Sequence, residues 1–176
     1  MKKKKKWIWI SLLVLVLILF GLQQYYIYVT QDQRQEEALA IQAAQNQLGI
    51  TSPDELRKYV WGEKSDADNI YWTMTAKNKD NQDIMVWVKF DNNNQPVKDA
   101  TGVHSELLQN GMSETQIRNR FSSDVPGGEI KRIMPGVVNN IYVWQVYYKD
   151  DTHNYYRFYR FSNGEQVDLV YTLPNS

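Results

Sequence analysis

The sequence predicts an α+β protein in which an N-terminal transmembrane helix is followed by two small domains, each a helix packed on a three- to four-stranded antiparallel β-meander. Three observations lead to this prediction. The chain opens with five lysines and a long apolar segment, and an alanine-rich helical stretch comes next. The remainder holds aromatic and β-branched strands separated by polar turns, and this pattern occurs twice.

The apolar segment has the length and composition of a membrane-spanning helix. Trp7–Leu22 carries no charge, and the tyrosine-rich stretch that follows extends the segment to residues 7–29. A spanning helix needs about 20 mostly apolar residues, with aromatic residues at its two ends. The basic tail at residues 1–6 stays in the cytoplasm by the positive-inside rule. We therefore expect a single-pass cell-membrane protein whose N-terminus is cytoplasmic and whose C-terminal domains are extracytoplasmic.

A cleaved signal peptide is the alternative interpretation of the same segment, because a basic region followed by an apolar one also describes an export signal. Signal peptidase requires small residues just beyond the apolar region, and here the chain reads QQYYIYVTQDQ. The sequence contains no cysteine, which excludes a lipoprotein signal. These two features favour a retained anchor.

The exported part is acidic and has no disulfide bonds. Without Lys2–Lys6, 15 of the 20 basic residues remain against 20 acidic ones, which argues against a nucleic-acid partner. An exported chain without cysteine depends on its apolar core and its hydrogen bonds for stability. About 146 residues follow the membrane segment, enough for one ordinary domain or two very small ones.

An internal repeat at an offset of 71 residues divides the exported part into domains at residues 30–103 and 104–176. NIYWTMTAKNKDNQDIMVWVKFDNNNQ aligns without gaps on NIYVWQVYYKDDTHNYYRFYRFSNGEQ. Each copy predicts a hairpin, with strands at 70–77 and 84–90 in the first and at 141–148 and 155–161 in the second. A last strand is expected at 97–100 and at 167–173. Because each domain is small, we expect the two to pack together.

Each meander is preceded by a predicted helix. DQRQEEALAIQAAQNQLG has apolar residues at helical spacing and ends at Gly49, and it continues from the membrane segment. SETQIRNRFSSD opens with a capping pair, Ser113 and Gln116, and places Ile117 and Phe121 on one face. Residues 99–112 are expected to form the connection between the domains.

The second hairpin predicts one helix-covered face and one candidate partner-binding face. A loop centred on residues 151 and 152 pairs residues whose numbers sum to 303. One face then carries aromatic pairs such as Trp144 with Tyr159, against which the helix packs. The opposite face is unusually apolar, and its candidate binding residues are Tyr147, Tyr156, Phe158 and Arg160. Burial of this face by the other domain is the alternative.

No catalytic, metal or cofactor site is predicted. His104 stands beside Ser105 without the context of a catalytic triad, and His153 lies in a turn next to acidic residues. SDADN, around Asp66 and Asp68, lacks the glycine and the distal glutamate of a calcium loop. DVPGGE, at residues 124–129, lacks the lysine and hydroxyl of a phosphate-binding loop and indicates a turn. We expect a protein that is not an enzyme and has no cofactor.

The basic tail, the retained span, the Ala- and Glu-rich helix and the two meanders together resemble the TseB/YpmB-like cell wall elongation regulators of Gram-positive bacteria. The resemblance covers essentially the whole chain and implies a tandem of cystatin-like domains related to the PepSY group. It also implies a non-enzymatic protein that binds the elongation-specific penicillin-binding transpeptidase of peptidoglycan synthesis. An inhibitor or chaperone of a secreted peptidase is the alternative, and an envelope hydrolase is a third class.

Overall fold

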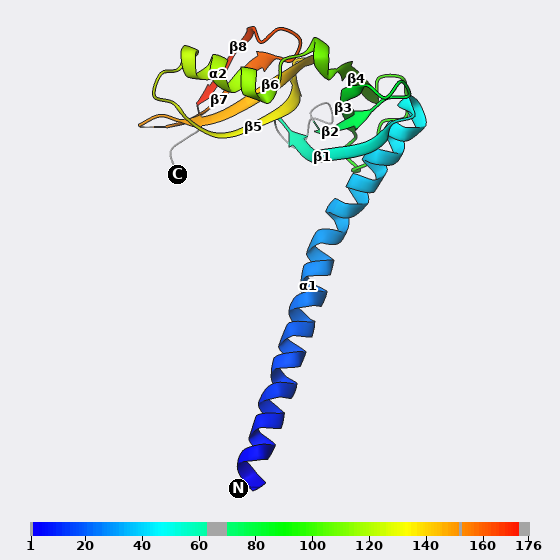
Figure 1. The fold of residues 1–176 in the computed structure, drawn as a ribbon, viewed down its shortest axis with the longest axis vertical. Helices are drawn as coiled ribbons and strands as arrows, with labels where there is room; N and C mark the ends of the chain where they lie inside the picture. The colour runs from blue at the N-terminus through cyan, green and yellow to red at the C-terminus, as the bar shows by residue number, and fades with distance from the viewer. Residues whose placement is uncertain (1, 63–69, 152, 173–176) are drawn as a thin grey trace. The chain divides into compact units, whose positions relative to one another are not determined.

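The computed structural model describes residues 2–62, 70–151 and 153–172, and the chain divides into two units, 1–38 and 39–176 (Figure 1). The helices are α1 (Lys2–Leu48), η2 (Leu108–Asn110), a 3₁₀ turn, and α2 (Glu114–Asp124). The strands are β1 (Thr51–Val60), β2 (Ile70–Lys77), β3 (Asp83–Phe90), β4 (Val103–Leu107), β5 (Glu129–Val138), β6 (Ile141–Lys149), β7 (Asn154–Arg160) and β8 (Gln166–Thr172).

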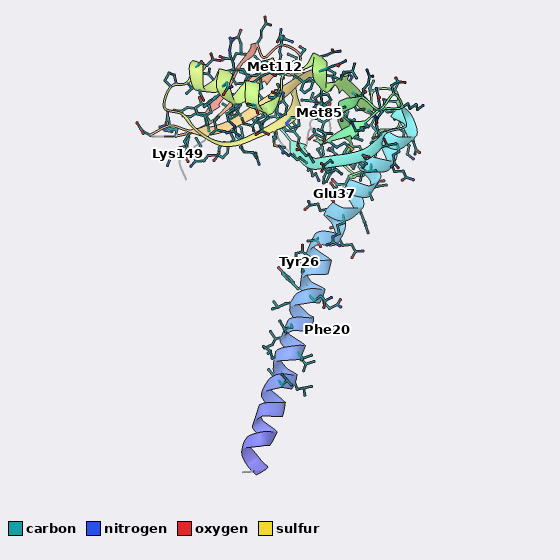
Figure 2. All side chains as sticks on the ribbon, in the orientation of Figure 1. Phe20, Tyr26, Glu37, Met85, Met112 and Lys149 are labelled. Carbon is teal, nitrogen blue, oxygen red and sulfur yellow. The ribbon has the colours of Figure 1, made fainter. Side chains whose placement is uncertain are left out.

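Helix α1 joins the predicted membrane segment and the predicted first-domain helix into one continuous helix. It is long and apolar enough to cross a membrane, with a mean hydropathy of 2.0 in its most apolar window. Large apolar side chains from Leu12 to Leu22 are exposed, as Figure 2 shows at Phe20. Gly49 ends the helix in the left-handed conformation at φ +67°, and its N–H donates to the carbonyl of Gln45 over 2.8 Å.

Two four-stranded antiparallel sheets follow, in the strand orders β1-β2-β3-β4 and β5-β6-β7-β8. We call them sheet A and sheet B. The first strand of each sheet, β1 and β5, was not predicted. β1 contains Pro53 and two irregularities of register, and β5 contains Pro135 and Gly136, so neither has the apolar alternation of a central strand. Both are edge strands, where such residues are tolerated.

The strand predicted at residues 97–100 is wrong, and β4 lies instead within the predicted connection. The side chain of Asp99 accepts a hydrogen bond from the N–H of Thr101 at 2.8 Å, and the N–H of Gly102 donates to the carbonyl of Asp99 at 3.0 Å. A Cβ on Gly102 would lie 1.9 Å from the carbonyl oxygen of Val97, so the turn requires glycine. The turn brings β4 beside β3, and sheet A therefore extends past the predicted boundary at residue 103 to Leu107.

The predicted register of the second hairpin is confirmed. Tyr148 pairs with Tyr155 and Trp144 with Tyr159, as the sum of 303 requires. The gapless alignment of the two repeats misplaces the first strand of one hairpin against that of the other by one residue. The reason is that the loop at 150–153 is one residue shorter than the loop at 78–82. Since a shift of one residue exchanges the faces of a strand, Trp72 corresponds in space to Trp144 and not to Val143.

The two sheets share a hydrophobic core. The end of α1 places Ala40 and Ala44 on one face of sheet A. The other face of sheet A contributes Tyr71, Met85 and Trp87 to a cluster that also holds α2 and the inner face of sheet B. The expectation that the two halves pack together is therefore confirmed. Figure 1 shows α2 lying over β5, β6 and β7.

Helix α2 begins as predicted, and its position defines which face of sheet B remains for other contacts. The hydroxyl of Ser113 accepts from the N–H of Gln116, and the side chain of Gln116 accepts from the N–H of Ser113, which completes a capping box. Ile117 and Phe121 are buried against sheet B, with the ring of Phe121 4.8 Å from that of Tyr148. The side of sheet B opposite α2 therefore carries the candidate site.

Candidate partner-binding face

A row of three tyrosines crosses the face of sheet B that points away from α2. Tyr147 on β6 pairs with Tyr156 on β7, which pairs in turn with Tyr171 on β8. We call these three residues the tyrosine row. The rings of Tyr147 and Tyr156 stack at 5.0 Å, and Tyr171 is 53% exposed. On the other side of Tyr147, Arg132 of β5 places its guanidinium carbon 6.0 Å from the ring centre.

Trp61, which follows β1, packs on this row. Its ring meets those of Tyr156 and Tyr171 edge-on, with centres 5.2 and 5.6 Å apart. Edge-to-face contacts of this kind stabilise an aromatic cluster by about 0.5–1.5 kcal/mol each beyond the burial of area. The cluster therefore holds the tyrosines in fixed positions while part of their surface stays open to solvent.

The four residues predicted for this face have different environments. Tyr147 and Tyr156 are half-buried and belong to the row. Phe158 is fully buried under Trp61 with ring centres 4.8 Å apart, so its predicted exposure is wrong. Arg160 is exposed but lies further along the strand, where it lines a separate pocket of about 220 Å³.

Burial of this face by the first half of the chain, the alternative interpretation, is correct for its inner part. Tyr59 of β1 covers the inner part, because a Cβ on Gly136 would lie 2.2 Å from its ring and the glycine leaves that space free. The outer part is the tyrosine row. Trp61, Arg132 and Tyr171 were missed as site residues. Only Tyr171 had a signal in the sequence, its place in a predicted strand.

Tyr59 and Tyr159 are buried tyrosines with raised pKa values. Burial raises the pKa of Tyr59 well above its ordinary value of about 10, and it raises the pKa of Tyr159 to about 12. The hydroxyl of Tyr59 has no hydrogen-bond partner within the part of the chain that the structure describes. The neutral form of each side chain is thus the one that fits the folded state.

We therefore predict that stability falls in alkali and that Tyr59→Phe reduces the fall. Above pH 10 the unfolded tyrosines ionise while the folded ones stay neutral, so the free energy of unfolding falls by about 1.4 kcal/mol per pH unit per tyrosine. Tyr59→Phe should equal or exceed the wild type at pH 8 and show a shallower slope above pH 10 in denaturant titrations of the full chain in detergent. An unchanged slope would contradict this account.

The two histidines have structural contacts. His104 stacks on Tyr142 with ring centres 3.8 Å apart, and its Nε2 lies 3.2 Å from a carboxylate oxygen of Glu106. Ser105 points to the opposite face of β4, because side chains alternate along a strand. His153 lies in the β6–β7 turn, as predicted, and its backbone N–H donates to the side-chain carboxylate of Asp150 at 2.8 Å.

Among residues 2–62, 70–151 and 153–172, no group of three or more His, Cys, Asp or Glu side chains is arranged to hold a metal ion. The predicted acidic pair Asp66 and Asp68 lies outside the described residues. The turn predicted at residues 124–129 follows α2, where the N–H of Gly128 donates to the carbonyl of Val125.

Asp99 and Glu129 have lowered pKa values through their hydrogen bonds to Thr101 and Lys131 respectively. Both are exposed.

The architecture defines a class of protein: an α+β chain with an apolar N-terminal helix and two four-stranded antiparallel sheets, each packed with a helix. The solved structure of the YpmB protein from Bacillus subtilis has a similar fold, with a TM-score of 0.61 over 78% of this chain and 96% of that chain. The sequence identity is 18%, so the likeness establishes a YpmB-like fold. No family model and no curated protein matches the sequence.

Proposed function

We propose that the protein is a membrane-anchored, extracytoplasmic binding protein that regulates a cell-envelope partner through the tyrosine row. One observation carries the proposal: three aromatic side chains on neighbouring strands are held in place, Tyr156 and Tyr171 by Trp61 and Tyr147 by stacking on Tyr156, yet remain partly exposed. Tyrosine and arginine are enriched in protein interfaces, where rigid aromatic side chains act as anchors at low entropic cost. The protein acts by binding and not by catalysis.

The exposed apolar part of α1 supports the anchor. Leu17 and Leu22 are each about 60% exposed, and an apolar surface of this length is stable only in lipid. Lys2–Lys6 keep the N-terminus in the cytoplasm, so residues 39–176 lie outside the membrane. The anchor confines them to the same surface as a membrane-bound partner, and this raises their effective concentration and makes a modest interface sufficient.

The resemblance to the TseB/YpmB-like regulators, together with the YpmB-like fold, supports the elongation-specific penicillin-binding transpeptidase as the partner. On this proposal the two sheets with their helices are cystatin-like domains that tune lateral peptidoglycan synthesis. The transpeptidase is itself membrane-bound, so both proteins would be confined to the same surface.

Site-specific photo-crosslinking in intact cells tests the proposal. A photoreactive amino acid replaces Tyr171 in the full chain, and a matched variant carries it at Asn119, an exposed position of α2 on the other side of sheet B. We expect capture of the elongation-specific transpeptidase from position 171 and not from position 119. Tyr147→Ser should reduce this capture at least tenfold while the fold is retained, since truncating an interface anchor costs about 2 kcal/mol or more.

The identity of the captured protein distinguishes the proposed function from its alternative. Capture of a secreted peptidase from position 171 would favour the inhibitor or chaperone function instead. Equal capture from positions 171 and 119, or no capture from position 171, would show that the tyrosine row is not the binding face.

A further inference from the structure

Three basic side chains line one pocket at the junction of the two sheets. Arg57 and Lys58 come from β1 and Arg132 from β5, and the pocket of about 290 Å³ is completed by Ile133 and Met134. Both strands are at the edges of their sheets. Three cations in one pocket are unexpected in an exported part that carries more acidic than basic residues.

Irregular backbone on both strands builds this cationic pocket. The pairing of β1 with β2 shifts register twice before Arg57, and Ser52 and Glu55 have left-handed φ values of 49° and 51°. β5 shifts register immediately before Arg132. Bulges of this kind bend a strand and re-aim its side chains, and they are common beside binding sites. The Nη1 of Arg57 donates to the carbonyl of Ile133 at 3.2 Å, which fixes the guanidinium against β5.

The charges of Arg57 and Arg132 are incompletely neutralised by the described residues. The guanidinium of Arg57 lies 3.5 Å from Glu55 and 3.9 Å from Glu114, longer than the distance of about 2.7–2.9 Å of a strong charge-assisted hydrogen bond. Arg132 has no carboxylate partner within the described ranges and rests over Tyr147. The nearby Lys131 and Glu129 pair with each other at 2.6 Å, so that carboxylate is already engaged. An added carboxylate therefore finds at Arg132 a guanidinium that no carboxylate of the described residues engages, beside an Arg57 whose two carboxylate contacts are long.

We infer that this pocket binds an Asp or Glu side chain of the protein partner, on a segment that also lies on the tyrosine row. The inference rests on the proposed function. Arg132 belongs to both features, because it lines the pocket and pairs across the sheet with Tyr147. Arginine presents two parallel N–H donors that match a carboxylate, and such pairs fix the register of an interface as well as adding to its affinity. We therefore expect the partner segment to carry an Asp or Glu close to the residues that contact the tyrosine row.

Charge reversal in the full chain tests this inference. Arg57→Glu with Arg132→Glu should reduce photo-capture from position 171 at least tenfold, and Arg57→Gln with Arg132→Gln should give a smaller loss. Arg120→Glu, on the exposed side of α2, is the matched control and should capture as the wild type does. Hydrogen exchange of sheets A and B in each variant establishes that the fold is retained.

Zero-length coupling identifies the occupant. Carbodiimide joins an amine to a carboxylate with loss of one water and no spacer, so we expect Lys58, or a lysine from Arg132→Lys, to couple to an Asp or Glu of the captured partner. If capture from position 171 survives charge reversal, the pocket does not bind the partner, and the proposed function of the tyrosine row still stands. Loss of capture without any coupled carboxylate would overturn the carboxylate as occupant. No capture from position 171 even in the wild type would remove both proposals.

Discussion

Trp87→Ala is expected to lower the free energy of unfolding of residues 39–176 by about 3–5 kcal/mol, the range for removing a large aromatic side chain from a core. Trp87 is 1% exposed and sits between the sheets, with its ring 4.8 Å from that of Tyr142 and 5.0 Å from that of Phe161. Both of these partners belong to the second half of the chain. The cavity would therefore loosen sheet A and sheet B together.

Hydrogen exchange measured by mass spectrometry on the full chain in detergent checks this prediction. Amide protection in β3 and in β6 should fall together, because the two sheets share one core. Trp87→Phe is the control and should cost about 1–2 kcal/mol, since it keeps an aromatic ring and removes an Nε1–H that is buried without a partner in the described part of the chain. Protection lost in β3 alone would mean that the sheets unfold independently.

Features fixed by neighbouring residues were predictable from the sequence. The capping box at Ser113 depends on a residue three positions away, and the register of the second hairpin depends on its own short loop. Both predictions are confirmed. The continuous helix α1 follows from an unbroken run of residues without glycine or proline between Gln23 and Leu48.

Features fixed by contacts distant in the sequence were not predictable. β1 is a strand only because β2 supplies its hydrogen bonds, and its own residues include Pro53 and several charges. The exposure of Phe158 was misjudged because Trp61, almost a hundred residues earlier, covers it. The cationic pocket likewise joins residues of β1 and β5 that have no relation in sequence. Each of these depends on how the two halves pack.

The contrast between the two sheets explains why, among the described residues, the candidate face lies on sheet B and not on sheet A. Sheet A is covered by the end of α1 on one face and by the shared core on the other. Sheet B has α2 on one face, and among the residues that the structure describes Tyr59 and Trp61 reach across the other. These two side chains cover the inner part of the sheet, and the outer row stays partly exposed within the described part of the chain.

Arginine in place of both Leu15 and Ile18 is expected to remove the protein from the membrane. The two side chains lie three residues apart on one side of α1, near the middle of the apolar segment, and both are more than half exposed. Each arginine near the centre of a spanning helix costs about 2.5–3.5 kcal/mol on insertion, so the pair costs about 5–7 kcal/mol. The measurement is the share of protein that stays with the membrane pellet after an alkaline carbonate wash.

Leu15→Ile with Ile18→Leu is the matched control, because it exchanges the two side chains and keeps the hydropathy; this variant should pellet with the membrane as the wild type does. Protease added to intact protoplasts should digest residues 39–176 of the wild type and spare those of the double-arginine variant, which would remain in the cytoplasm. If the wild type is instead recovered from the medium with an N-terminus near residue 30, the segment is a cleaved signal. A freely diffusing product loses the concentration advantage of the anchor, and a modest interface at the tyrosine row would no longer be sufficient.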